Sequence, residues 1–209
     1  MNWTNSGEGR ATLWDLRAGL LLAMLLLGAC ASQQPAPEEP TETATAEGAQ
    51  TEADARLRNR FEDAVALKRG DDLERAEAEF REILESDPGL TGPLANLGII
   101  AMERGEPELA EEYFQRVVEL DPTHPQALNA LGVLVRKRGE FELAEAYYRR
   151  ALAADPDHQA AIRNLAILLE LYRGKLPEAL ALVERYQSLQ AEPDPALEGW
   201  IFDLKNRIN

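Results

Sequence analysis

Residues 97–122 read LGIIAMERGEPELAEEYFQRVVELDP, and residues 131–156 read LGVLVRKRGEFELAEAYYRRALAADP. The two stretches are closely similar and begin 34 residues apart. Asp-Pro pairs recur at the same interval, at Asp87-Pro88, Asp121-Pro122 and Asp155-Pro156. A fixed period of this size is typical of a solenoid built from one repeated supersecondary unit. Such a stack offers an extended groove and rarely a catalytic pocket, so the period favours a binding protein.

Each unit has the apolar spacing of two helices. In one unit the apolar residues are Leu94, Leu97, Ile100 and Ala101, followed by Leu109, Ala110, Tyr113, Phe114, Val117 and Leu120. This spacing gives each helix a broad buried stripe. Proline disfavours helix at the residue before it, so each Asp-Pro pair is expected to end a hairpin. Thr91 and Thr123 are the expected N-caps of the helices that follow.

Gly98 and Gly132 lie in the middle of predicted helices, where glycine costs about 0.5–1 kcal/mol relative to alanine. We interpret them as points where the paired helix approaches closely, with the small residues Ala110 and Ala144 on the facing side. Replacing Gly132 with leucine should then cost about 1–3 kcal/mol through overpacking.

The repeats resemble the tetratricopeptide (TPR) pattern. The matching positions are Leu97, Gly98, Ala110, Tyr113, Phe114 and Pro122 in one unit, and Leu131, Gly132, Phe141, Ala144, Tyr148, Ala151 and Pro156 in the next. The resemblance covers roughly residues 54–194, as repeats at about 54–90, 91–124, 125–158 and 159–194. It implies an all-α fold: a TPR right-handed superhelical solenoid of about four helical hairpins. The outer repeats match less closely, as terminal repeats of solenoids do.

Residues 195–209 are expected to form a C-terminal capping helix. Leu197, Trp200, Ile201, Leu204 and Ile208 fall on one side of it at helical spacing. We interpret this helix as a lid over the exposed face of the fourth repeat. Trp200 is then a packing residue rather than a platform for a ligand.

Residues 1–29 have the composition of an export signal. A polar stretch with Arg10 and Arg17 precedes an apolar run at 19–27. That run is too short to span about 30 Å of hydrocarbon as a helix, so we expect a signal peptide and not a permanent anchor.

The sequence Leu27-Gly28-Ala29-Cys30 resembles a bacterial lipobox. The resemblance implies a lipoprotein signal peptide, cleavage before Cys30 and attachment of fatty acyl chains such as palmitate to that residue, which would hold the chain on a membrane. An ordinary secretory cleavage site is the alternative. Ala31 stands where the lipoprotein family usually places its inner-membrane retention aspartate. The resemblance therefore implies the periplasmic face of the outer membrane of a Gram-negative bacterium.

Residues 30–53 are expected to be a lipidated cysteine followed by a disordered acidic tether. Residues 31–53 hold three prolines, five glutamates and no bulky apolar side chain, too little to bury for folding. The whole chain has a formal net charge of −15, which argues against nucleic acid as a partner.

Three asparagines are candidates for a peptide-binding groove. Asn96 and Asn164 immediately precede the Leu-Gly or Leu-Ala pair of their repeats, whereas Asn129 lies one residue earlier in the repeat between them. An amide can clamp the backbone of an extended peptide. The other interpretation, which we favour, is that these amides bond the neighbouring repeat and fix its stacking.

Arg136, Lys137 and Arg163 fall near the same expected surface, where they could hold an acidic side chain or a C-terminal carboxylate. The alternative is that these charges are solvated or paired with nearby glutamates. His124 and His158 lie 34 residues apart, but no cysteine or carboxylate motif completes a tetrahedral metal site. We therefore expect both histidines to be turn or capping residues.

No phosphate-binding loop, nucleophile elbow or zinc-protease motif occurs in the sequence. The expected function is therefore not enzymatic and needs no metal or cofactor. We expect an outer-membrane-anchored periplasmic adaptor or scaffold, which binds a protein or peptide segment of an envelope assembly. The alternative is a self-associating structural subunit that has no peptide ligand and forms a homo-oligomer.

The architecture resembles three groups of envelope proteins. The first is the pilotin lipoproteins of type IV pilus assembly, of the PilF and PilW type. The second is the NlpI type, which gathers peptidoglycan hydrolases. The stretch from Arg163 to Gly174, with Gly199-Trp200-Ile201, is similar to small TPR proteins encoded beside TonB, ExbB and ExbD. These resemblances imply pilus biogenesis, peptidoglycan remodelling or energised transport.

Overall fold

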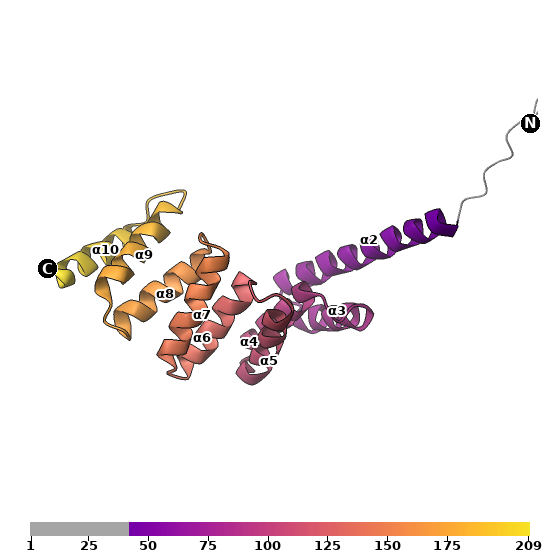
Figure 1. Ribbon diagram of the computed structural model, residues 1–209, viewed down its shortest axis with the longest axis horizontal. Helices are drawn as coiled ribbons and strands as arrows, with labels where there is room; N and C mark the ends of the chain where they lie inside the picture. Colours follow the sequence, from indigo (N-terminus) through magenta and orange to yellow (C-terminus); the bar gives the residue numbers. More distant parts are fainter. Residues whose placement is uncertain (1–41) are drawn as a thin grey trace, which may run out of the picture. The chain divides into compact units, whose positions relative to one another are not determined.

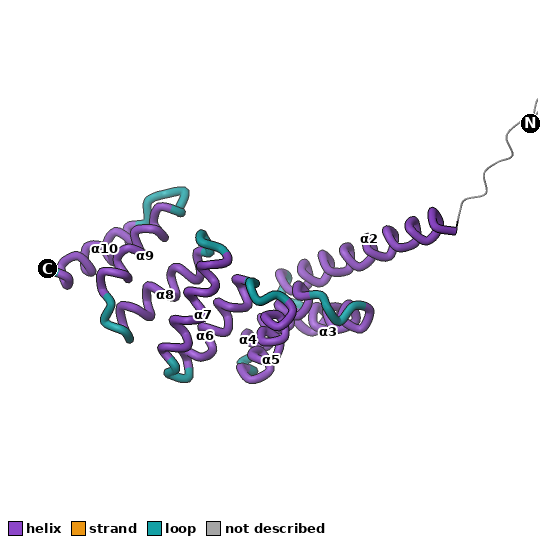
Figure 2. Tube along the Cα trace, viewed as in Figure 1, coloured by secondary structure: helices purple, strands orange, loops and turns teal. Residues whose placement is uncertain are grey.

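The computed structural model describes residues 42–209, and every regular element in them is an α-helix (Figures 1 and 2). The helices are α2 (Glu42–Arg69), α3 (Leu73–Ser86), α4 (Thr91–Arg104), α5 (Pro107–Leu120), α6 (Pro125–Lys137), α7 (Phe141–Ala154), α8 (Gln159–Leu171), α9 (Leu176–Ser188) and α10 (Pro195–Ile208). The all-α prediction is confirmed. The expected signal peptide, Cys30 and the first part of the expected tether lie outside the described residues.

Residues 50–209 form one compact unit, and residues 42–49 begin α2 in the other. Within residues 50–209 the helices pair as hairpins: α4 with α5, α6 with α7, and α8 with α9. Each hairpin then packs on the next through α5 with α6 and α7 with α8, and α3 packs on α4 in the same way. The helices α6 and α8 also touch, so the first helices of these two hairpins are neighbours.

Aspartate and proline together close each hairpin, as the sequence predicts. Asp87, Asp121 and Asp155 have extended φ angles of −144°, −134° and −131°. Each aspartate also organises the turn, because its Oδ1 accepts a hydrogen bond from the backbone N–H two residues later, at 2.9, 3.0 and 3.1 Å respectively. The proline enforces the extended conformation, and the carboxylate satisfies a backbone donor in the loop.

Histidine, not threonine, caps the helices that follow the second and third of these turns. The Nδ1 atom of His124 accepts a hydrogen bond from the Ala127 N–H at 3.3 Å at the start of α6. His158 does the same for Ala161 at 3.2 Å at the start of α8. The expected capping role of both histidines is therefore confirmed.

The prediction that Thr91 and Thr123 are N-caps was wrong. The hydroxyl of Thr123 bonds Asp121 at 2.7 Å in the preceding turn and is therefore engaged away from α6. Thr91 is the first residue inside α4, after the N-cap Leu90, which makes no side-chain capping bond.

The mid-helix glycines make room for an aromatic ring. A Cβ atom added to Gly132 would lie 2.5 Å from the ring of Tyr148, and one added to Gly98 would lie 2.7 Å from the ring of Phe114. The expectation of close approach is confirmed. The predicted neighbours of the two glycines were wrong, because the atoms nearest to an added Cβ belong to these rings and not to Ala110 or Ala144.

The core is divided between the hairpins. Phe80, Phe114 and Tyr148 occupy one repeated position, are at most 1% exposed and lie in three successive apolar clusters. Because each cluster combines residues of adjacent hairpins, no hairpin has a complete core of its own.

The capping helix forms as expected. Leu197, Ile201 and Leu204 of α10 are buried in one cluster with residues of α8 and α9. Trp200 is half-buried against this cluster, and its Nε1 donates a hydrogen bond to Glu170 at 2.6 Å. Ile208 differs from the expected pattern, because it is 39% exposed at the end of the helix.

Helix α2 runs through the second part of the expected tether. Its residues from 42 to 53 are helical, whereas the sequence predicts a disordered segment there. Alanine, glutamate and glutamine favour helix, so a helix fixed by packing at Ala64 can extend towards the N-terminus. Residues 51–56 are exposed, so this part of the helix buries little surface. Among the described helices, none is both long and apolar enough to cross a membrane.

Candidate protein-interaction surface

The first helices of the three central hairpins share a half-buried apolar position. Ile99 on α4, Val133 on α6 and Ile167 on α8 lie 34 residues apart, and each is partly exposed. Equal positions in stacked units fall in line, so the three side chains form a row, here called the inner stripe. An apolar row that remains partly open to solvent is suited to a partner's apolar side chains.

Repeated ion pairs hold successive hairpins together. Arg104 pairs with Glu77, Arg138 pairs with Glu111 at 2.5 Å, and Arg173 pairs with Glu145 at 3.1 Å. In each pair the arginine follows or ends a first helix, and the glutamate lies on the second helix of the preceding hairpin. We call these three pairs the ion-pair ladder.

A second set of contacts reinforces the ladder. Arg116 donates a hydrogen bond to the carbonyl oxygen of Pro88 at 3.1 Å, and Arg150 donates one to that of Pro122 at 3.3 Å. Both arginines therefore bond the turn that closes the preceding hairpin. The hairpins are consequently held together by polar side-chain contacts as well as by the apolar clusters.

Two of the predicted groove asparagines bond each other. Asn164 Nδ2 on α8 donates to Asn129 Oδ1 on α6 at 2.9 Å. This bond joins neighbouring first helices, which is what the stacking interpretation requires, and it occupies one donor and one acceptor that a peptide backbone would need.

Asn96 lies apart from that pair. Its Oδ1 accepts a hydrogen bond from Lys68 Nζ on α2, and its Nδ2 bonds the Gly92 carbonyl oxygen at 2.9 Å. Burial lowers the pKa of Lys68 despite the nearby charge of Glu103. Sequence reasoning missed Lys68, because its repeat departs from the pattern of the others. The three asparagines therefore do not form one row.

The three predicted cations lie in three different environments. Arg136 is half-buried near the Tyr148 hydroxyl, and burial raises the pKa of Tyr148 while Arg136 opposes that rise. Lys137 is exposed and lines a hollow of about 330 Å³ beside Arg138. Arg163 is exposed on α8 and lines a hollow of about 470 Å³ against α10.

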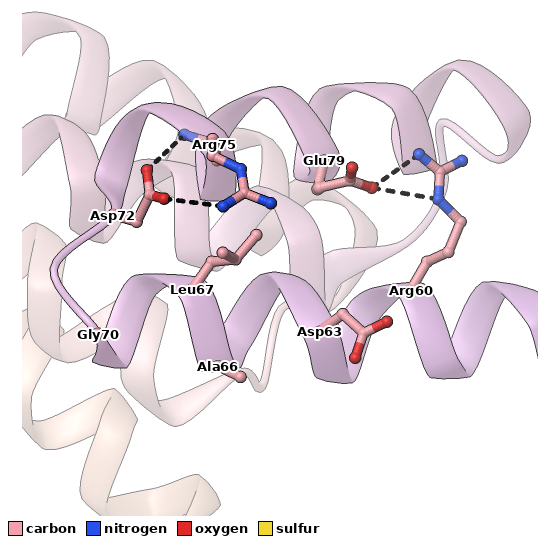
Figure 3. A pocket seen from close by; sticks show the side chains of 8 residues that line it. All are labelled: Arg60, Asp63, Ala66, Leu67, Gly70, Asp72, Arg75 and Glu79. Carbon is pink, nitrogen blue, oxygen red and sulfur yellow. Dashed lines mark hydrogen bonds and ion pairs between the residues drawn. The ribbon is translucent and has the colours of Figure 1, made fainter.

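A larger polar hollow, of about 700 Å³, is lined by residues of α2, α3 and the turn that joins them (Figure 3). Its charges are mostly neutralised within the chain. Arg60 on α2 pairs with Glu79 on α3 at 2.8 Å, and Asp72 pairs with Arg75 at 3.2 Å. These contacts fasten α2 to α3, and the hollow offers little uncompensated charge to a ligand.

The sequence profile of the family described as tetratricopeptide repeat matches residues 95–159 and 135–196. These are the residues that form the hairpins from α4 to α9. The chain is a tetratricopeptide-repeat protein. No curated protein matches the chain in sequence.

Solved TPR structures share this fold. PilF of Pseudomonas aeruginosa is 21% identical over 74% of this chain and 69% of its own, with a TM-score of 0.64. MamA is 24% identical over 61% of this chain and 74% of its own, with a TM-score of 0.52. A Thermobaculum terrenum O-GlcNAc transferase is 27% identical over 67% of this chain but only 28% of its own, with a TM-score of 0.58.

One carboxylate in this TPR protein has an unusual environment. Glu145 on α7 is 8% exposed and accepts hydrogen bonds from Lys175 at 2.7 Å, Arg149 at 2.8 Å and Arg173 at 3.1 Å. Burial alone would raise the pKa of Glu145, but the bonds and charges of Lys175 and Arg149 outweigh it and lower the pKa to about 2. Sequence reasoning missed this residue, because two of its three partners follow it by about 30 positions.

The described surface offers apolar and charged side chains that can contact a partner. Across residues 42–209 no group of three or more histidine, cysteine or acidic side chains is arranged to hold a metal ion. TPR domains generally act as scaffolds that bind protein partners. The inner stripe presents partly exposed apolar side chains, and the hollow at Arg163 combines apolar with polar ones.

Proposed function

We propose that this TPR protein is a periplasmic adaptor, anchored in the outer membrane through Cys30, which binds a segment of a larger envelope assembly along its first helices. The observation that carries the proposal is the inner stripe. Ile99, Val133 and Ile167 stay partly exposed in line, while the ion-pair ladder holds their helices at fixed spacing. A preorganised apolar row binds an extended or helical segment at low entropic cost.

Site-specific photo-crosslinking in intact cells tests the adaptor function. A photoreactive phenylalanine at Val133 should form a covalent adduct with one partner, which mass spectrometry of the purified adduct identifies. The matched control is the same group at Ala146, an exposed position on the second helix α7. Equal adducts at both positions, or none at Val133, would contradict binding along the first helices.

The lipid anchor has its own test. Labelling with a palmitate analogue should mark the wild-type chain, and Cys30→Ser should abolish the label and release the protein into the soluble periplasmic fraction. A labelled C30S variant, or a wild-type chain recovered without acyl chains, would contradict the anchor. This result is independent of the crosslinking experiment, because it concerns only the N-terminal segment.

We assign the envelope process to pilus assembly in the first instance. Support comes from the resemblance of the architecture to pilotin lipoproteins and from the similarity of the fold to PilF. The crosslinked partner decides between this process, peptidoglycan remodelling and TonB-type transport, since the three involve different proteins.

A self-associating structural subunit is the second candidate. The observation in its favour is on α10, where Phe202 is 68% exposed and Ile208 is 39% exposed. Sedimentation velocity over a wide range of protein concentration should then show reversible dimers that Phe202→Ser removes. A monomer at all concentrations rejects this candidate.

A further inference from the structure

Four glycines lie inside the helices from α4 to α10, and three of them contact an aromatic ring. A Cβ atom added to Gly92 would lie 3.1 Å from the ring of Phe61. The corresponding distances to a ring are 2.7 Å at Gly98 and 2.5 Å at Gly132. In each case the ring comes from another helix. Glycine weakens a helix by about 0.5–1 kcal/mol, and the contact with a ring offsets that penalty at these positions.

Gly199 in α10 is the exception. A Cβ atom added there would meet no atom within 4 Å, so no contact within the described part of the chain accounts for this glycine. An unpaired ring lies three residues further along the same helix. Phe202 is 68% exposed, the highest value among the large apolar side chains of the described residues. A glycine without a ring and a ring without a glycine therefore occur together on α10.

Both residues belong to one exposed stripe of α10. The stripe has members at intervals of four, three and four residues, which are Pro195, Gly199, Phe202 and Asn206. At about 100° per residue, these side chains lie on the side of α10 opposite the one that packs on α8 and α9. Alternating intervals of three and four residues are those at which one helix packs along another. The stripe therefore has the spacing of a helix-packing face.

An antiparallel pair of such stripes brings the ring and the glycine together. In a parallel pair equal residues meet, so Phe202 would face Phe202. In an antiparallel pair centred between residues 200 and 201, Phe202 of each copy faces Gly199 of the other. Pro195 then faces Asn206 of the second copy. A two-fold axis relates the two copies, so each contact occurs twice.

The charges beside the stripe suit the same arrangement. Glu198 and Lys205 lie about 20° apart on one flank of α10, so the carboxylate of one copy faces the ammonium group of the other in the antiparallel pair. Glu198 has no ion-pair partner among residues 51–209, and Lys205 is 53% exposed while paired with Glu184 at 2.8 Å. On the other flank, Asp203 is paired with Arg207 of its own helix at 3.0 Å. In a chain of net charge −15, α10 carries two acidic and two basic side chains and is locally neutral.

We propose that two copies of this chain pair through antiparallel α10 helices, with Phe202 of each copy packed on Gly199 of the other. The partner is a second copy because the stripe and its charges are complementary to themselves in this register. The proposal rests on self-association, the second candidate function, and specifies its surface and its register. The contact uses none of the inner-stripe residues, so each copy keeps its own stripe available for a partner.

Gly199→Ala separates this contact from the stability of the chain. Sedimentation velocity of the full chain, in which Cys30→Ser excludes acylation, measures the dissociation constant of the dimer. Gly199→Ala should raise that constant at least about tenfold, because a Cβ atom would hold the ring away from the helix at both contacts. The same variant should resist urea better as a monomer, since alanine favours helix. Leu143→Ser, which removes an exposed apolar side chain of α7, is the matched control and should leave the constant unchanged.

An exchange of the two residues tests the register. Gly199→Phe and Phe202→Gly should each abolish dimers at concentrations at which the parent chain is dimeric. The double variant should restore dimers, because the ring and the glycine then meet with their positions exchanged. Circular dichroism verifies that the helices are intact. Dimers in both single variants, or their absence in a folded double variant, would reject the register.

The possible failures are distinguishable. A monomer at every concentration rejects self-association and this pair together, and crosslinking at Val133 then decides the adaptor function independently. Dimers that neither G199A nor Phe202→Ser weakens preserve the self-associating candidate and reject the α10 contact. Dimers that Phe202→Ser removes but G199A leaves unchanged would assign the ring to another surface, and the proposed register is then wrong.

Discussion

Gly132 and Tyr148 fit together because glycine lacks the one carbon atom that would collide with the ring. The same fit recurs between Gly98 and Phe114 one repeat earlier. A ring that is fully buried against a helix backbone cannot move aside without disturbing its whole cluster. The helical penalty of glycine is therefore offset by the packing of the ring.

Gly132→Ala should destabilise the protein by about 1–3 kcal/mol, because its Cβ would lie 2.5 Å from the Tyr148 ring. Urea unfolding followed by circular dichroism measures the effect. The matched control is Gly199→Ala in α10, where an added Cβ meets no atom within 4 Å. That substitution should stabilise the protein by about 0.5–1 kcal/mol. A neutral G132A variant would show that the ring can shift.

Glu145 should make the stability of the last repeat depend on pH only in strong acid. Its folded-state pKa is lowered from 4.5 to about 2, so its contribution is complete above about pH 4.5 and is lost as the pH falls towards 2. Glu145→Gln should cost about 1–3 kcal/mol at pH 7, since three cations lose their shared anion. The difference in unfolding free energy between wild type and E145Q should shrink below pH 4.5. A difference that stays constant down to pH 2 would reject this role for the carboxylate.

At the scale of single helices, α10 behaves as the lid that the sequence predicts. Removing residues 195–209 would expose the buried neighbours of Leu197, Ile201 and Leu204 on α8 and α9. We expect the truncated chain to lose several kcal/mol and to bind hydrophobic dyes, because burial of each such side chain contributes about 1.5–3 kcal/mol. Phe202→Ser is the control, since Phe202 is exposed and its loss should leave the melting temperature nearly unchanged. An unchanged melting temperature after truncation would contradict the lid.

The element pattern was readable from the sequence because it depends on spacing along the chain. The structure confirms the predicted repeat period, the helix ends at the Asp-Pro pairs and the apolar helix faces. Each of these predictions depends only on residues that are close together in the sequence or one period apart. The residue opposite Gly132 was misassigned by one helical turn, because Ala144 and Tyr148 lie four positions apart on the same face of α7 and their spacing does not tell which of them reaches the glycine. The Glu145 cluster joins residues about 30 positions apart, and the sequence carries no local signal of that contact.

The N-terminal part of α2 was misjudged for a different reason. Composition excludes a packed core in residues 42–53, but it does not exclude a helix that propagates from a folded neighbour. The candidate site was predicted in outline only. The sequence identified Arg163 as a candidate. The apolar walls of its hollow and the hydrogen bond that Glu170 accepts from Trp200 could be identified only from the position of α10.

At the scale of the whole molecule, stability is shared between neighbouring hairpins and does not come from one central core. The helical residues 51–56 are exposed, so a chain that begins at Asp54 should melt within about 2 °C of one that begins at Cys30. A chain that begins at Leu73 lacks α2 and the Phe61–Phe80 contact, whose centroids lie 5.7 Å apart, and should melt at a much lower temperature. Differential scanning calorimetry compares the three chains. Equal melting of the two shorter forms would show that α2 contributes nothing to the fold.

The ion-pair ladder also determines how such a chain can lengthen during evolution. Arg104 reaches 27 positions back to Glu77, and Arg138 reaches 27 positions back to Glu111. A duplicated segment of 34 codons would therefore encode one glutamate and one arginine of the ladder. The glutamate would pair with the arginine of the hairpin after it, and the arginine would pair with the glutamate of the hairpin before it. Arg173 breaks the rule, because it reaches 28 positions back to Glu145. New copies can thus be inserted among the middle units without redesign, whereas growth beyond the last one requires a new junction.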